Sequence, residues 1–544
     1  MKKRIIAVFL AAVMLTGCGV PGESGNDAKN DSSGSGGDNG KELTFALTTD
    51  PFTLDPQLCT TMNEGAVDFH LYEGLYRLDG SEVVPAGAES YDVSADGLTY
   101  TFHLRDGAKW SDGKEVAADD YKYGFERVVD PKVASPGSYL AGWVKNANKI
   151  VKGELPLEEL GIKVIDDKTI EFQLEYPASY FVGMLSTPAL LPARRDIVEE
   201  KGKDYGTAPD SAVYNGPFAL EKWSKNEGLV LKKNEEYWNA EEIKMDTVNI
   251  EIIPDAATQL GMFENGELDY VEIPSEQVSN YPDAETFLTG SVEYLQFNLE
   301  EDEIYANKDF RKAVSAAIDR SEYITMAKGG MGSPATRLVL PVLTGTSGTY
   351  GEDYPLDLYS ENSEPDKAKE FLASAMTELN IANASDITIT LLCNDTEASR
   401  KSAEVYQEQI KKNLGINVEV EQIAAKQYWS NWAEENFGFM IGGFSPDYSD
   451  PYTYLELFIS DNSSNHSNYV SEAYDSAMIS SQTELDPVKR YGYMVEAEKV
   501  VCEDLPIIPV MCAEKSYLIN DKLKNFTPCF VAATYNWIHA EIEE

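Results

Sequence analysis

One segment late in the chain constrains the fold more than any other. Residues 397–415, EASRKSAEVYQEQIKKNLG, have helical spacing and end at Gly415, the residue type that most often ends a helix in the left-handed conformation. Residues 416–423 then alternate as a strand, and residues 307–320 form a second amphipathic helix. Helices that alternate with strands in this way build sheets whose faces they cover. The expected fold class is therefore α/β.

The chain is too long for one hydrophobic core, because 544 residues exceed the size at which a single core stops growing. Strands are expected at residues 43–47 and 98–104, with a hairpin turn at Asp112-Gly113. Residues 63–80 have apolar side chains near helical spacing and predict one helix, and residues 117–129 predict another. The first two hundred residues thus resemble a small α+β unit, and at least two domains are expected.

The N-terminus carries the pattern of an export signal. Lys2, Lys3 and Arg4 precede an apolar run at residues 5–15, which is too short to span a bilayer comfortably. The run ends in Leu-Thr-Gly-Cys at Cys18, which resembles the lipobox of bacterial lipoproteins. That resemblance implies removal of a signal peptide at 1–17 and diacylation of Cys18. A generic signal peptide with an incidental cysteine is the alternative.

A flexible tether is expected after Cys18. Of the 22 residues at 19–40, 17 are Gly, Ser, Asn or Asp, which cannot bury enough apolar surface to form a core. Two acyl chains on Cys18 would hold such a chain stably at a membrane. We therefore expect residues 18–40 to anchor a folded body on the extracytoplasmic face of the membrane of a bacterium, in keeping with a single-membrane cell.

The charge and the motif inventory exclude several classes of function. The net charge of −47 repels phosphate backbones, so we expect no nucleic-acid partner. The four histidines, His70, His103, His466 and His539, have no metal-binding spacing, and no nucleophile elbow or phosphate loop occurs. We expect no catalytic residues, no metal and no cofactor. A surface hydrolase or an adhesin is kept as the alternative class.

Five cysteines follow Cys18, at positions 59, 393, 502, 512 and 529. Their odd number and the lack of C-x-x-C spacing argue against a disulfide framework. Cys502 and Cys512 either bond across a strand pair or stay as buried free thiols, and the sequence leaves both options open.

Nine phrases, in order along residues 43–540, carry a resemblance to one family: LDP (54–56), YEGLYRLDG (72–80), YTFHLRDGAKWSDG (100–113), DYKYGFERVVDPKVASPGSYL (120–140), YNGPFALEKW (214–223), LVLKKNEEYWN (229–239), DFRKAVSAAIDR (309–320), GGFSPDYSDP (442–451) and LPIIPVM (505–511). Together they resemble the extracellular solute-binding proteins of family 5, and within it the oligopeptide-binding proteins of ABC importers.

The resemblance implies a two-lobed, periplasmic-binding-protein-like flytrap of type II, in its three-domain subgroup. Lobe I would combine 41–72, 206–290 and 515–544, an inserted α+β domain II would span 73–205, and lobe III would span 291–514. Two crossings between the lobes would form the hinge. A monomer is expected to close around an oligopeptide and present it to the permease subunits of an ABC importer.

The resemblance also implies ligand-binding residues. Asp447 matches the aspartate that binds the α-ammonium of the peptide, and Gly443, Phe444 and Ser445 match the strand that pairs with the peptide backbone. Thr60, Thr61 and Met62 match the opposing main-chain segment, and Asn215 lies in a matching loop. From the residues alone, Asp447 could instead form a turn with its own backbone, Phe444 could be a core aromatic, and Lys328 could be a solvated surface residue.

Two departures concern the ligand's C-terminus. Ile441 and Ser399 stand where oligopeptide members of the family often carry a basic residue and a histidine. Lys328, Arg337 or Arg400 are candidate replacements, or the ligand's carboxylate is not bound at all. Within the family, a dipeptide, a signalling peptide or a nickel chelate are alternative ligands, and the scarcity of histidines disfavours nickel.

Overall fold

The computed structural model describes residues 41–80, 82–178, 180–528 and 535–543. The expected signal peptide at 1–17, the lipidated Cys18, the tether at 18–40 and Cys529 lie outside these residues. Residues 40–544 form one compact unit. No helix of the described part of the chain is long and apolar enough to cross a membrane.

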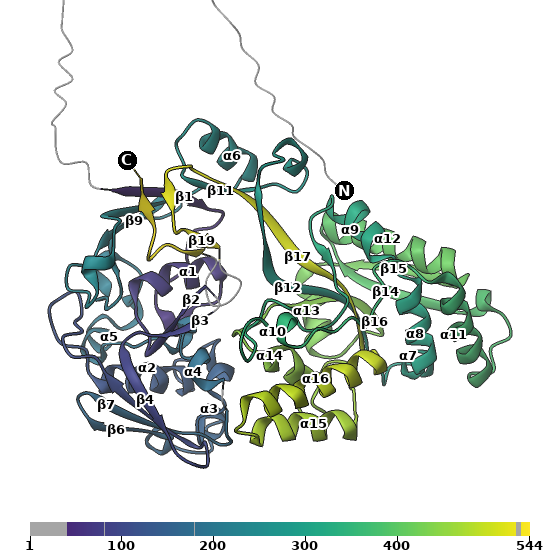
Figure 1. Cartoon of the computed structure of the whole chain (residues 1–544), viewed down its shortest axis with the longest axis horizontal. Helices are drawn as coiled ribbons and strands as arrows, with labels where there is room; N and C mark the ends of the chain where they lie inside the picture. The colour runs from purple at the N-terminus through teal and green to yellow at the C-terminus, as the bar shows by residue number, and fades with distance from the viewer. Residues whose placement is uncertain (1–40, 81, 179, 529–534, 544) are drawn as a thin grey trace, which may run out of the picture. The chain divides into compact units, whose positions relative to one another are not determined.

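An 11-stranded mixed sheet is the largest element of this unit (Figure 1). Its strands follow the order β15-β14-β16-β12-β17-β11-β1-β10-β9-β8, and β13 pairs with β17. The bounds are β1 Glu42–Leu47, β8 Phe218–Ser224, β9 Gly228–Lys233, β10 Thr247–Ile252, β11 Tyr270–Ile273, β12 Glu285–Phe297, β13 Ser333–Pro334, β14 Thr388–Asn394, β15 Asn417–Ile423, β16 Phe439–Phe444 and β17 Ile507–Ile519. Helices and strands alternate along much of this chain, and the expected α/β class is confirmed.

Two long strands join the halves of the sheet. β12 and β17 each contain 13 residues, pair antiparallel, and run side by side in Figure 1. Their register shifts between Leu288 and Val292, where the ladder is locally interrupted. The two crossings expected near residues 290 and 514 fall in these strands, beside that irregularity. β12 and β17 therefore carry the chain between the segments assigned to lobes I and III.

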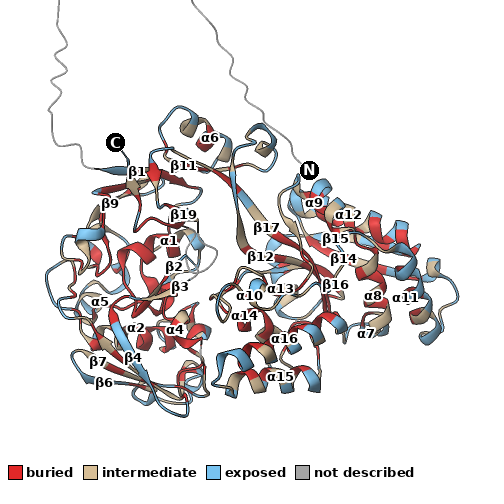
Figure 2. Ribbon diagram, in the orientation of Figure 1, coloured by how far each residue is buried: buried red, intermediate tan, exposed pale blue. Residues whose placement is uncertain are grey.

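Helices cover both faces of the β14–β16 region. One face packs against α8 (Lys308–Ala317), α9 (Arg320–Lys328), α11 (Pro365–Glu378) and α12 (Glu397–Leu414). Side chains alternate along a strand, so Leu391 and Phe439 enter that core while Leu392 and Met440 face α13 (Ala425–Ala433) on the other side. Figure 2 shows α8 and α12 with buried residues on one side and exposed residues on the other. Gly415 ends α12 in the left-handed conformation, as expected, at φ +71°.

A separate four-stranded antiparallel sheet occupies the segment expected to be an inserted α+β domain. Its order is β4-β5-β7-β6, with bounds β4 Ala88–Val93, β5 Thr99–Leu104, β6 Ile162–Asp166 and β7 Thr169–Gln173. α2 (Ala118–Val129) packs on β6 and β7 through an apolar face that includes Tyr121, Phe125 and Val128. The predicted hairpin turn is present, because Gly113 adopts φ +85° between the bridged residues Lys109 and Glu115.

The prediction of one helix over residues 63–80 is wrong after Leu71. α1 (Met62–Leu71) ends at Leu71, and the chain then forms β2 (Tyr76–Asp79), which pairs with β3 (Glu82–Pro85). An added Cβ at Gly74 would press on the carbonyl oxygens of Leu185 and Tyr76, so this glycine serves a close backbone approach. Tertiary packing thus overrides the local helical spacing after Leu71.

The remaining helices and strands complete the unit. The helices are α3 (Ala147–Val151), α4 (Phe181–Met184), α5 (Arg195–Lys201), α6 (Ala256–Glu264), α7 (Glu303–Ala306), α10 (Tyr350–Asp353), α14 (Tyr452–Leu455), α15 (Glu472–Thr483) and α16 (Pro487–Asp504). Two strand pairs lie near the C-terminus: β18 (Leu523–Lys524) with β21 (Glu541–Ile542), and β19 (Thr527–Pro528) with β20 (Tyr535–Asn536). Cys59, Cys393, Cys502 and Cys512 are all free thiols, so the optional Cys502–Cys512 bond is not formed.

Candidate ligand-binding site

The stretch from Gly442 to Pro451 leaves the sheet at the end of β16 and forms a turn. The backbone N–H of Asp447 donates to the hydroxyl of Thr453, 3.2 Å away. Asp450 provides the turn's own cap, because its carboxylate accepts from the N–H of Tyr452 at 2.9 Å. The same carboxylate accepts two hydrogen bonds from the buried guanidinium of Arg490, at 2.7 and 2.9 Å. Asp450 holds the turn in place and leaves the side chain of Asp447 free of that task.

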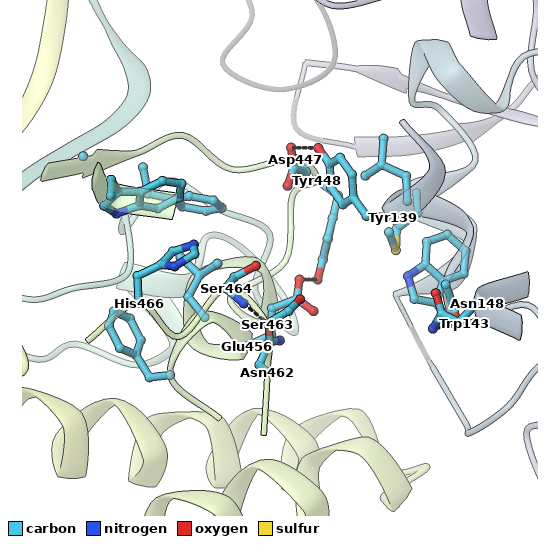
Figure 3. A pocket seen from close by; sticks show the side chains of 18 of the residues that line it. Tyr139, Trp143, Asn148, Asp447, Tyr448, Glu456, Asn462, Ser463, Ser464 and His466 are labelled. Atoms are coloured by element: carbon cyan, nitrogen blue, oxygen red, sulfur yellow. Dashed lines mark hydrogen bonds between the residues drawn. The ribbon is translucent and has the colours of Figure 1, made fainter. Parts of the chain in front are cut away.

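Asp447 projects into a cavity rather than back to its own turn (Figure 3). The hydroxyl of Tyr139, from the short helix η2 (Ser138–Ala141), donates to its Oδ1 at 3.1 Å. Burial raises the pKa of Asp447 to about 6, and the hydrogen bond from Tyr139 limits the rise. A carboxylate in such surroundings gains from a cationic partner, because the partner offsets the loss of hydration.

The cavity around Asp447 has a volume of about 520 Å³ and mixed walls. One wall comes from residues 139–184, in the segment expected to form an inserted domain, and the other comes from residues 294–466. Aromatic side chains predominate among its larger residues: Tyr139, Trp143, Tyr176, Tyr294, Trp429, Trp432, Phe444, Tyr448 and Phe458. None of the described residues that line it is a lysine or an arginine. The cavity is thus concave, largely apolar and negatively polarised, as expected of a small-ligand site.

A second carboxylate lines the same cavity, and sequence reasoning missed it. Glu456 begins the short helix η10 (Glu456–Phe458) and accepts a hydrogen bond from the hydroxyl of Tyr448 at 2.9 Å. Burial raises the pKa of Glu456 to about 8, the hydrogen bond from Tyr448 lowers it, and the charges of Asp447 and Asp450 raise it further. The available signal was a glutamate inside an otherwise apolar run, YTYLELF at 452–458.

The strand edge beside the cavity is open on one side. β16 pairs with β12 as far as Val292 and Phe444, whereas its pairing with β14 stops at Met440. From Ile441 onward, no described strand pairs with that second edge, and Gly443 and Ser445 are exposed. An extended chain could add to such an edge through its main-chain N–H and C=O groups. Gly443, Phe444 and Ser445 lie along this unpaired edge, and their pairing with a peptide backbone stays a prediction.

The glycine pair has a packing role as well. A Cβ on Gly442 would overlap the ring of Tyr294, and one on Gly443 would lie 3.3 Å from the carbonyl oxygen of Val292. The ring of Phe444 meets Tyr454 edge-on at 5.2 Å while also lining the cavity, so its core and site roles coexist. Trp429 and Trp432 likewise line the cavity from α13.

The opposing segment at 60–62 leads into α1. The backbone N–H groups of Thr60 and Thr61 donate to the carboxylate of Glu64, at 2.8 and 3.0 Å, and Thr61 caps the helix. Met62 has half of its side chain exposed and lines a neighbouring cavity of about 500 Å³ together with Ser445. Met62 and Ser445 are thus brought together. The amide groups of Thr60 and Thr61 are occupied within the chain.

Asn215 is placed away from the Asp447 cavity. It is buried, its Oδ1 accepts from the N–H of Glu73 at 3.0 Å, and its Nδ2 donates to the carbonyl of the same residue at 3.0 Å. These two hydrogen bonds fasten the 215 loop to the end of α1. The geometry supplies Asn215 with a structural role.

The three candidate anchors for a ligand carboxylate all have carboxylate partners within the chain. Lys328 Nζ lies 2.7 Å from Glu293 and lines a cavity of about 390 Å³ that also touches Gly443. Arg337 is buried and paired with Glu498. Arg400 is exposed on α12 and lies 2.9 Å from Glu404. Lys328 is the one placed beside the open strand edge.

The described residues contain no group of three or more His, Cys, Asp or Glu side chains able to hold a metal ion. His70 stacks on Trp537 at 3.3 Å in the core, and His103 lies beside Asp92 at the surface. These positions give a nickel ion no assembled ligand set within the described part of the chain.

Residues 82–466 match the family model described as bacterial extracellular solute-binding proteins, family 5 Middle. The chain is 31% identical to the "Dipeptide-binding protein" of Lactococcus lactis, over 89% of this chain and 91% of that protein. It is 29% identical to the "Dipeptide-binding protein DppE" of Bacillus subtilis, over 94% and 93% of the two chains. The structure titled "Listeria monocytogenes OppA bound to peptide" matches with a TM-score of 0.72 and 31% identity, covering 93% of this chain and 100% of that one. The chain therefore belongs to the bacterial extracellular solute-binding proteins of family 5.

Proposed function

We propose that this protein captures oligopeptides outside the cytoplasm, holds them by their free N-terminal amine, and delivers them to an ABC importer. The observation that carries the proposal is the side chain of Asp447. It lies in an aromatic cavity without a basic partner among the lining residues, next to an open strand edge. Relatives that cover nearly the whole chain are described as dipeptide- and oligopeptide-binding proteins, which supports the same ligand class.

The α-ammonium of the peptide would replace water as the partner of Asp447. A hydrogen-bonded ammonium–carboxylate pair stabilises both charges in a cavity where neither is well hydrated. Tyr139 already donates to one carboxylate oxygen, at 3.1 Å, and orients the group. The carboxylate that binds the ammonium and the hydroxyl that orients it therefore come from segments far apart in the chain, at residues 447 and 139.

The peptide backbone would extend along the unpaired edge at Gly443–Ser445. Main-chain hydrogen bonds give affinity without reading the sequence of the ligand, which suits a protein that imports many peptides. Thr60, Thr61 and Met62 would face the ligand from the other side. Of these, Met62 shares a cavity with Ser445, whereas the amides of Thr60 and Thr61 would first have to leave Glu64.

The carboxyl end of the ligand would be held weakly. Lys328 is our preferred contact for it, because its side chain lines the cavity next to Gly443. Its ammonium is already 2.7 Å from Glu293, so a ligand carboxylate would have to compete with that pair. Arg400 is exposed and paired, and would contact only a longer ligand.

Cys18 would anchor the mature protein by its lipid chains. The tether at 18–40 would let the folded body reach the permease while staying at the membrane surface. The substitution Cys18→Ala is expected to release the protein from the membrane fraction. Retention of that variant at the membrane would contradict the lipid anchor.

The proposal is tested by ligand binding. Native mass spectrometry of the purified protein should detect co-purifying peptides, and calorimetry should show that free-amine tetrapeptides bind while their N-acetylated forms do not. Asp447→Asn preserves the shape of the side chain and is expected to abolish this discrimination. Asp461→Asn, which makes the same change at an exposed position that does not line the cavity, is the matched control. Equal binding of acetylated and free peptides by the unmodified protein would overturn the proposal.

A further inference from the structure

Asp447 and Glu456, the two partly buried carboxylates of the Asp447 cavity, lack the guanidinium partner that three fully buried carboxylates of this chain have. Asp55 pairs with Arg127 at 2.6 Å, Asp450 with Arg490 at 2.7 Å, and Glu498 is paired with Arg337. In contrast, Asp447 and Glu456 accept hydrogen bonds from the phenols of Tyr139 and Tyr448, and no lysine or arginine lines their cavity among the described residues. Asp447 and Glu456 thus have neutral donors, whereas Asp55, Asp450 and Glu498 have guanidinium groups.

A third polar side chain on the wall of the Asp447 cavity, that of His466, has a ring nitrogen without a hydrogen-bond partner among the described residues. His466 is 9% exposed, and its Nδ1 makes no hydrogen bond within the described residues. The nearest carboxylate, that of Glu435, lies 3.8 Å away, beyond hydrogen-bonding distance. Burial lowers the pKa of His466, so the ring is a neutral donor and acceptor. The imidazole of His466 is therefore available to hydrogen-bond a ligand group in the cavity.

The two carboxylates line one cavity, and the charge of Asp447 acts on Glu456. Tyr448 follows Asp447 in the chain, and its hydroxyl donates to Glu456 at 2.9 Å. Figure 3 shows Asp447 and Glu456 among the side chains of this cavity, with the hydrogen bonds from Tyr139 to Asp447 and from Tyr448 to Glu456. A lysine or arginine residue carries a second positive charge at the end of a long side chain, away from its own α-ammonium. One basic residue could therefore contact both carboxylates at once.

We propose that the cavity is a subsite for a doubly positive ligand residue, here called the dicationic subsite. In it, Asp447 holds the α-ammonium of the ligand and Glu456 holds the basic side chain of the same first residue. The protein then prefers peptides that begin with arginine or lysine. This inference rests on the proposed function, because it assumes that the peptide amine is at Asp447. Asn462, Ser463 and Ser464 line the same cavity and offer further hydrogen-bonding groups for a guanidinium.

The physical reason is the cost of burying an unpaired charge. A buried guanidinium opposite Glu456 is compensated, and a carboxylate–guanidinium pair makes two parallel hydrogen bonds. A neutral side chain of the same shape would form no such pair and would leave the carboxyl of Glu456 protonated. The aromatic walls partly shield both groups from water and thereby increase the difference between charged and neutral ligands.

The test compares two ligands of nearly equal shape. Calorimetry measures the dissociation constants of Arg-Ala-Ala-Ala and citrulline-Ala-Ala-Ala, which differ in the charge of the first side chain. We expect the unmodified protein to bind the arginine peptide at least about tenfold more tightly, a difference of about 1.4 kcal/mol. Equal affinities would overturn the inference. A preference that appears only when arginine and citrulline are compared at the second position would also overturn it.

A pair of variants separates this inference from a general effect of charge. Glu456→Gln should bring the two dissociation constants within about twofold of each other, whereas Asp461→Asn should keep the tenfold ratio. A ratio that survives Glu456→Gln would contradict the assignment of Glu456. Tetra-alanine distinguishes the two levels of the argument. If tetra-alanine binds through Asp447 while arginine brings no gain, the inference alone fails, and if no free-amine peptide binds, the proposed function fails with it.

Discussion

The hydroxyl of Tyr139 donates a hydrogen bond to Asp447 Oδ1 at 3.1 Å, between residues 308 positions apart in the chain. Tyr139 belongs to η2, in the segment expected to form an inserted domain, and Asp447 follows β16 of the large sheet. The two stacked tyrosines Tyr180 and Tyr448, with centroids 5.3 Å apart, join the same segments next to this contact. The candidate site is thus assembled from both sides of the cavity.

Removal of the phenolic hydroxyl of Tyr139 is expected to shift the pH dependence of peptide binding. Asp447 must be ionised to hold an ammonium, so affinity should fall as the pH drops through about 6, the pKa of its carboxyl. The hydrogen bond from Tyr139 lowers this pKa, so Tyr139→Phe should raise it and move the loss of affinity to higher pH. Calorimetry of one free-amine peptide between pH 5 and 8 measures the midpoint. A midpoint that moves down, or stays, would show that Tyr139 does not act on Asp447.

The substitution Asp447→Ala is expected to weaken peptide binding by at least about 1.5–3 kcal/mol, the scale of a hydrogen bond to a charged group. The reason is that the buried α-ammonium loses its counter-ion. The dissociation constant of a mixed tri- to pentapeptide pool measures the effect. Unchanged affinity would show that the amine is bound elsewhere.

Amidation of the ligand's C-terminus is expected to change the free energy of binding by less than about 1 kcal/mol, the scale of an exposed ion pair. Lys328, Arg337 and Arg400 all have carboxylate partners within the chain, at Glu293, Glu498 and Glu404. A ligand carboxylate therefore replaces an existing pair and gains little. Comparison of free-acid and amide tetrapeptides is the measurement, and a large loss on amidation would assign an anchor to Lys328.

Binding of an arginine-first peptide should release protons at pH 7. Glu456 has a pKa of about 8, so its carboxyl is mostly protonated before the ligand arrives, and a guanidinium beside it favours the ionised form. The groups around it, Asp447, Asp450 and Tyr448, carry negative or neutral charge and do not provide that effect. Calorimetry in buffers of different ionisation enthalpy counts the protons. The citrulline peptide should release fewer, and equal release would contradict the dicationic subsite.

Gly442→Ala should destabilise the fold by about 1–3 kcal/mol, the usual cost of overpacking a filled site. The added methyl group would overlap the ring of Tyr294, a buried residue of β12 that also lines the cavity. Gly261→Ala in α6 is the matched control, since nothing lies within 4 Å of its added Cβ and alanine favours a helix. Urea denaturation of both variants measures the difference. Similar stability of the two variants would rule out the packing role of Gly442.

Much of this arrangement could be predicted from the sequence. Helical and strand spacing indicated α8, α12 and β15, and the order of nine short phrases indicated the family. Such features depend on local chemistry and on neighbours close in the chain. The helix expected over 63–80 failed after Leu71, because a strand pair and close contacts at Gly74 decided the conformation there.

The residues by themselves determined that the chain alternates helices with strands and presents an aspartate after a glycine pair, since these follow from spacing and residue type. Only the tertiary structure decided that Tyr139 contacts Asp447 and that Glu456 shares its cavity without a basic partner. It also decided that Arg337 and Arg490 serve buried carboxylates of the chain itself. With 92 acidic residues, pattern alone cannot separate a paired carboxylate from an unpaired one. The distinction depends on long-range packing, which sets each side chain's burial and partners and thereby its charge.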